Sequence, residues 1–167
     1  LEKWDEAAAL VQSAFSHPRL NASAFRAASW HYFNSCVLLR TGKTSEALRA
    51  LNDATPLLTD KMGWNLTFRL HEIIVLYEAG LYDLLETKIQ NMRQFVKRTQ
   101  RNSELYRPMK LIQILMEWHR NSLDIKKTLV SAQKYLQELR DFHKTIPFDP
   151  SSGELIRFEA WLEAKKK

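Results

Sequence analysis

The chain has 167 residues and a formal net charge of +6, from 25 Lys or Arg against 19 Asp or Glu. A chain of this length can bury a sizeable core and most often forms one domain. Four glycines and five prolines are too few for the many turns of an all-β fold, and the single cysteine excludes an intramolecular disulfide framework. We therefore expect one all-α domain over residues 1–167, in a reducing, cytoplasmic compartment.

The sequence opens LEKWDEAAALV, without an initiator Met and without a charged-then-apolar signal segment. We interpret it as a fragment of a longer protein. No apolar run approaches the roughly 20 residues that a membrane-spanning helix needs, so membrane insertion is not predicted.

Apolar residues recur at helical spacing in about eight segments along the chain. Gly42 and Gly80 each end a helix, and the polar stretch TQRNS separates the fifth helix from the sixth. Pro108 is tolerated because it lies near the start of its helix. The predicted helices cover residues 2–16, 22–41, 44–58, 62–79, 81–100, 104–120, 123–143 and 150–167.

The last of these helices follows two prolines, and Ser151 or Ser152 can cap it. Its apolar stripe consists of Leu155, Phe158 and Leu162. We expect this helix to pack on the helix at 123–143 and to seal that end of the protein.

The stretch RTGKTSEA, residues 40–47, contains the Gly-Lys-Thr tail of a phosphate-binding loop. The full motif needs a further glycine at position 37, where Val37 stands, and a preceding strand. The pattern instead predicts a tight turn between two helices, in which Gly42 adopts the left-handed conformation that ends the first helix.

The helix–turn–helix arrangement repeats. Aligning Gly42 with Gly80 places LLRTGKTSEAL on LYEAGLYDLLE, and the opening KWDEA fits the same register. The pattern resembles the tetratricopeptide repeat, a helix–turn–helix unit of about 34 residues. The residues that carry the resemblance are Gly42, Ala47, Leu51 and Ala54 in one unit and Gly80, Tyr82 and Leu85 in the next.

The resemblance implies a right-handed α-solenoid of antiparallel helix pairs. Residues 1–17 would be a half repeat, and residues 150–167 a capping helix. The helix pairs would cover residues 22–58, 62–100 and 104–143. The family's Trp-x-x-Leu-Gly start is absent, and Arg120-Asn121-Ser122 stands where the third turn glycine would be.

Stacked helix pairs of this family form a concave surface lined by the first helix of each pair. The resemblance therefore implies an interaction scaffold or sensor domain that binds a peptide or protein segment in this groove. Leu70 and Ile74 occupy positions that face the groove in the family pattern, but we expect them to pack between helices. Tyr32 and Cys36 stand where the carboxylate-clamping subgroup has Lys and Asn, so that activity is not predicted. The predicted partner contacts are Tyr32, Leu39, Tyr77, Lys110, Gln113, Glu117 and Arg120.

The charge distribution supports an alternative. Residues 88–144 contain thirteen Lys or Arg and five Asp or Glu, a balance of +8. Arg93, Lys97 and Arg101 follow one another at a spacing of four, and Arg98 lies beside them. Such a basic patch could attract nucleic acid or an acidic protein surface through its field. Self-association through an uncovered end of the repeat is a third hypothesis.

Catalysis finds little support in the sequence. The five histidines are scattered, and the stretch HEIIV, residues 71–75, lacks the second histidine of the His-Glu-x-x-His zinc pattern. Cys36 has no local histidine partner in its helix, while a histidine elsewhere in the chain could lie beside it in the fold. We therefore predict no enzymatic activity, no cofactor and no metal site.

Overall fold

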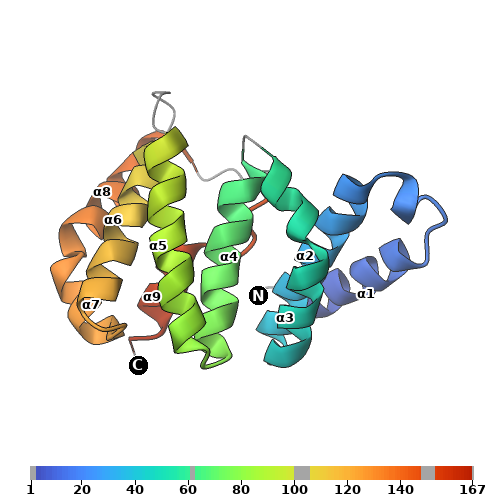
Figure 1. Cartoon of the computed structure of the whole chain (residues 1–167), viewed down its shortest axis with the longest axis horizontal. Coiled ribbons are helices and arrows are strands. Elements are labelled where there is room, and N and C mark those ends of the chain that lie inside the picture. Colours follow the sequence, from blue (N-terminus) through green and yellow to red (C-terminus); the bar gives the residue numbers. More distant parts are fainter. Residues whose placement is uncertain (1–2, 61–62, 100–105, 148–152, 167) are drawn as a thin grey trace. The chain divides into compact units, whose positions relative to one another are not determined.

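The computed structural model describes residues 3–60, 63–99, 106–147 and 153–166 (Figure 1). Within these ranges all regular secondary structure is helical, which confirms the all-α class. None of the described helices is both long and apolar enough to cross a bilayer. The helices are α1 Trp4–Phe15, η1 Leu20–Ala22, α2 Ala24–Arg40, α3 Thr44–Asp53, η2 Thr55–Thr59, α4 Trp64–Glu78, α5 Tyr82–Thr99, α6 Tyr106–Arg120, α7 Ile125–Ser131, α8 Gln133–Thr145 and α9 Phe158–Ala164.

The chain divides into two compact units. The first unit comprises residues 1–81 and 152–155, and the second comprises residues 82–151 and 156–167. The boundary between Leu81 and Tyr82 falls inside the helix pair predicted at 62–100. The single-domain organisation stays a prediction.

In the first unit, α2 packs against α1, α3, α4 and η2, and it runs beside α3 in Figure 1. The helix starts at Ala24 because the Ser23 hydroxyl accepts a hydrogen bond from the Arg26 N–H at 3.1 Å. The predicted helix at 44–58 ends early, at Asp53, and continues as the 3₁₀ helix η2. Pro56 lies at the start of η2, where its missing N–H costs no hydrogen bond.

The same pair of backbone hydrogen bonds ends α2, α4 and α6. In the first turn, Gly42 donates to the Leu39 carbonyl at 3.1 Å and Lys43 donates to the Leu38 carbonyl at 2.8 Å. These are the two bonds of a Schellman motif, which needs a left-handed residue. Gly42 has a φ of 79°, so the turn predicted for RTGKTSEA is confirmed.

The other two turns repeat this hydrogen-bond pattern. Gly80, with a φ of 71°, donates to the Tyr77 carbonyl, and Leu81 donates to the Leu76 carbonyl. In the third turn Ser122 takes the position of the glycine, with a φ of 52°, and the next residue, Leu123, also has a positive φ, of 62°. The strain of this turn is opposed by the Trp118 indole, which donates to the Leu123 carbonyl at 2.9 Å.

In the second unit, α6 packs against α5, α7 and α8, and α9 contacts α7. The helix predicted at 123–143 is two helices, because the backbone leaves the helical path at Ala132. Side-chain hydrogen bonds surround this break: Asn121 donates to the Ser131 hydroxyl at 2.9 Å, and that hydroxyl donates to the Thr128 carbonyl. Such bonds compete with those of the helix backbone.

The last helix starts later than predicted, at Phe158. Ser151 and Ser152, the predicted caps, lie outside the described residues. Gly153 has a φ of 81°, and Leu155 donates to the Gly153 carbonyl in a tight bend, so the backbone here is not helical. Leu155 is consequently 41% exposed rather than buried, whereas Phe158 and Leu162 are buried as predicted.

Candidate functional site

Tyr32, the first predicted partner contact, is an interior residue. Its side chain is 1% exposed, and its ring packs edge-on against Trp64 and His71, at centroid distances of 5.9 and 5.2 Å. While the chain itself encloses this side chain, a partner cannot contact it, so the sequence prediction that Tyr32 faces an open groove does not fit the structure. The family pattern treats this face of α2 as open, whereas here the chain itself covers it.

Leu70 and Ile74, on α4, are buried, which confirms that they pack between helices. Leu39 and Tyr77 are only partly buried, and their role in binding stays a prediction.

Buried polar groups connect α2, α3 and α4 beneath Tyr32. The Ser35 hydroxyl donates to the Ala47 carbonyl at 2.8 Å and lies 2.9 Å from His71 Nε2. Because its single proton is used on the carbonyl, Ser35 must accept from a protonated Nε2. The second ring nitrogen, Nδ1, is then an acceptor, and it has no hydrogen-bond partner within the described part of the chain.

The tertiary structure also brings Cys36 Sγ to 3.7 Å from His71 Nε2, a pairing that the sequence did not reveal. Burial lowers the pKa of His71 to about 3 and raises the pKa of Cys36 to about 12. Both groups are therefore neutral at physiological pH. A cysteine nucleophile needs its thiolate, so this pair is a core feature rather than a reactive dyad.

The predicted contacts on α6 are engaged within the second unit. Lys110 forms an ion pair with Glu138 of α8, and its ammonium lies 5.2 Å from the Tyr106 ring centroid. The hydrogen bond to Glu138 is the main cause that raises the pKa of Lys110. Glu117 and Arg120 pair with each other one turn apart on the same helix. Gln113 is partly buried.

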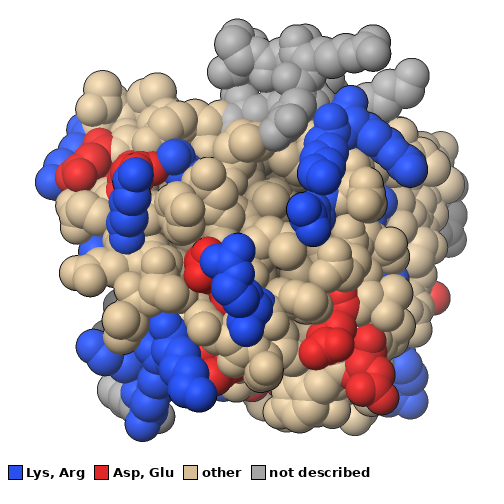
Figure 2. All heavy atoms as spheres, turned by 60° about the vertical axis from the view of Figure 1, so that its left-hand side comes forward, with Lys and Arg blue, Asp and Glu red and all other residues tan. Residues whose placement is uncertain are grey.

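The basic patch lies on α5, where Arg93, Lys97 and Arg98 are all exposed. The fourth member, Arg101, lies outside the described residues. Lys97 and Arg98 occupy the last turn of α5, where cations interact favourably with the helix dipole. Figure 2 shows Lys and Arg in several separate groups on the face it presents, with other residues between them.

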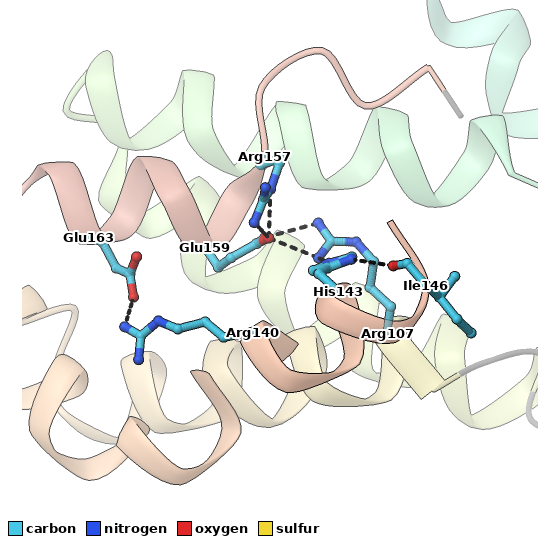
Figure 3. Close-up of polar contacts among 7 residues, drawn as sticks. All are labelled: Arg107, Arg140, His143, Ile146, Arg157, Glu159 and Glu163. Carbon is cyan, nitrogen blue, oxygen red and sulfur yellow. Dashed lines mark hydrogen bonds and ion pairs between the residues drawn. The ribbon is translucent and has the colours of Figure 1, made fainter. Parts of the chain in front are cut away.

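A buried ion-pair cluster holds α9 in the second unit. Arg107, at the start of α6, makes two parallel hydrogen bonds of 2.9 Å to the carboxylate of Glu159, which is 5% exposed (Figure 3). Arg157 donates to the same carboxylate, also at 2.9 Å. The pKa of Glu159 is lowered: burial alone would raise it, but the bonds from Arg107 outweigh that effect. His143 Nε2 accepts from Arg107 at 3.1 Å, and His143 Nδ1 donates to the Ile146 carbonyl at 3.2 Å.

Aromatic packing completes this attachment. The Trp118 ring of α6 lies 6.0 Å from Phe158 and 5.7 Å from Trp161, measured between centroids. The sequence analysis found Phe158 in the apolar stripe but missed Arg107 and Glu159. They lie 52 residues apart, and no local pattern links two such residues.

An open groove of about 630 Å³ in the second unit is lined by α7, α8 and the end of α9. Its apolar lining includes Leu129, Leu136 and Val130, and the Val130 side chain is 76% exposed. The charged lining consists of Lys126, Arg140, Glu163 and Lys166.

The charges around this groove are unequally matched. Arg140 of α8 and Glu163 of α9, which both line the groove, form an ion pair (Figure 3). Lys126 and Lys166 are exposed and have no ion-pair partner among the residues that the structure describes. The groove therefore combines an apolar floor with a net positive rim. In the sequence, only the excess of basic residues at 88–144 pointed to this site.

Comparison of the chain with family models, with curated proteins and with solved structures gives no match. Among the described residues, no group of three His, Cys, Asp or Glu side chains is arranged to hold a metal ion.

Proposed function

We propose that the chain is a protein-interaction module that binds an acidic, amphipathic segment of a partner in the groove formed by α7, α8 and α9. The observation that carries this proposal is the combination of exposed apolar surface at Val130 with two lysines, Lys126 and Lys166, that have no ion-pair partner in the described part of the chain. A groove of this kind suits an amphipathic helix, whose apolar side packs on the floor while its carboxylates meet the basic rim.

We further propose that the chain is a diverged helical repeat of the tetratricopeptide type, a right-handed α-solenoid. The recurrence of one turn geometry at Gly42, Gly80 and Ser122 supports this proposal. Repeat proteins of this kind act mainly by presenting helical surfaces to other proteins. The groove at α7, α8 and α9 differs from the concave surface that the family pattern implies, because the second helix of a pair and the terminal helix line it.

The proposal can be tested with a fluorescein-labelled 16-residue peptide that carries Leu on one helical face and Glu on the other. Fluorescence anisotropy with the full chain should give saturable binding, and a peptide with Lys in place of Glu should not bind. Lys126→Glu and Val130→Asp should each raise Kd about tenfold or more, because one reverses a rim charge and the other places a carboxylate on the apolar floor.

Lys134→Glu is the matched control, since Lys134 is an exposed lysine of α8 that does not line the groove. Lys134→Glu changes the net charge by the same amount as Lys126→Glu. An equal loss of affinity in both variants would therefore show that the peptide responds to the net charge of the protein and not to the groove. Failure of the wild-type chain to bind the acidic peptide at low salt would refute the proposal.

The exposed residues Arg93, Lys97 and Arg98 keep nucleic-acid binding as the second candidate function. Nucleic-acid binding would be favoured if the chain binds a labelled single-stranded RNA and this binding weakens steeply with salt. The double variant Arg93→Glu and Lys97→Glu should then lose this binding.

A further inference from the structure

A short segment of the chain leaves the second unit and lies in the first. Residues 152–155 belong to the first unit, whereas residues 82–151 and 156–167, on either side, belong to the second. The described part of this segment is Gly153-Glu154-Leu155.

The segment lies on an aromatic surface formed by α2 and α4. Trp64 is the centre of this surface. Its ring contacts Phe25, Tyr32 and Phe33, with centroid distances of 6.0, 5.9 and 5.7 Å. Phe25 is 40% exposed and Trp64 is half-buried. Aromatic surfaces of this kind are frequent in peptide-recognition sites.

The contacts of the segment are specific for its first two residues and for its backbone. A Cβ atom added to Gly153 would stand 3.2 Å from Cζ3 of Trp64, and the φ of 81° also favours glycine. Glu154 is a carboxylate that is only 7% exposed. The Leu155 N–H, which donates to the Gly153 carbonyl, also faces the Tyr32 hydroxyl, while the Leu155 side chain is 41% exposed.

Removing a carboxylate from water is costly, yet Glu154 is enclosed at this place. The arrangement resembles a ligand in a site: a glycine against a tryptophan ring, an enclosed acidic side chain and a backbone contact to a tyrosine. The third side chain points to solvent and contributes little to recognition.

We propose that the α2–α4 surface of the first unit is a binding site for a Gly-Glu bend, and that residues 153–155 are its built-in occupant, which a partner segment carrying the same dipeptide displaces. The covalent link gives the built-in segment an effective concentration in the millimolar range, so the site is closed to partners unless the segment is released. This site is separate from the groove at α7, α8 and α9, so a negative result for one proposal does not affect the other.

The test uses the full chain and a fluorescein-labelled peptide of residues 151–157, SSGELIR. Gly153→Val in the chain should release the built-in segment, because the valine meets the Trp64 ring and disfavours the positive φ. That variant should bind the peptide at least tenfold more tightly than the wild-type chain does. A tenfold difference in Kd means that the built-in segment leaves the site free in about one wild-type molecule of ten, because only the free fraction can bind the peptide.

Two controls make the result specific. A peptide carrying the same Gly153→Val change should not bind the released chain, and protection of Cys36 from a thiol reagent shows that the first unit is still folded. Should Gly153→Val fail this folding check, Glu154→Gln in the chain replaces it, because it removes the enclosed charge without a steric clash. Equal peptide affinity for wild-type and released chains, or no binding to a folded released chain at 1 mM peptide, on the order of the effective concentration, overturns the proposal.

Discussion

Replacing His71 with Gln should remove a pH-dependent loss of stability from the first unit. His71 is 2% exposed, and its Nε2–H donates to Ser35, a bond that the Gln amide can also make. Burial holds the pKa of His71 at about 3 in the folded chain, against an ordinary value of 6.5. The folded state therefore keeps this histidine neutral at a pH where the unfolded state protonates it.

The size of the effect follows from these two pKa values. Because the folded pKa is lowered, the stabilising contribution is complete above pH 6.5 and is lost as the pH falls from 6.5 toward 3. Each pH unit in this window lowers the free energy of unfolding by about 1.4 kcal/mol. Between pH 7 and pH 5 the wild-type chain should lose about 2 kcal/mol that His71→Gln does not lose.

The measurement is urea unfolding of both proteins at pH 7 and pH 5, followed by circular dichroism. The other four histidines and all carboxylates are common to the two proteins, so their contributions cancel in the difference between them. A difference in stability between wild type and His71→Gln that is the same at both pH values would show that His71 titrates normally, and the enclosed network with Ser35 would be wrong.

Four further outcomes test other parts of the fold. Gly42→Ala should lower the free energy of unfolding by about 1 kcal/mol, because open space surrounds the added methyl group and only the positive φ opposes it. Ser122→Gly should raise the free energy of unfolding by about 0.5 kcal/mol, because glycine adopts a positive φ without strain. Urea unfolding measures both changes, and a change of the opposite sign in either variant would contradict the shared turn. Cys36, whose pKa burial raises to about 12, should react with a thiol reagent only through opening of the first unit, so labelling as fast as that of a free thiol would be inconsistent with its position. Glu159→Gln should destabilise the second unit by about 3 kcal/mol, since it leaves the Arg107 guanidinium without its carboxylate; an unchanged melting temperature would show that the buried pair is not formed.

The candidate groove could be anticipated from the sequence only in part. The excess of Lys and Arg at 88–144 indicated a basic surface, but not which of these side chains stay unpaired. Lys110 is paired by Glu138 on another helix, while Lys126 is not paired among the described residues. The spacing of charges along one helix cannot reveal partners on its neighbours.

The sequence by itself determined the helical class, the approximate helix positions and the turn at Gly42, because these depend on spacing and on backbone conformation within a few residues. Only the tertiary structure decided that Tyr32 is enclosed, that Cys36 meets His71 and that Arg107 meets Glu159. Each of these contacts joins residues far apart in the chain, and their packing depends on how whole helices are placed. The same reason explains why the bend at Gly153 lies against Trp64: the glycine is visible in the sequence, but the tryptophan ring that requires it lies on a distant helix.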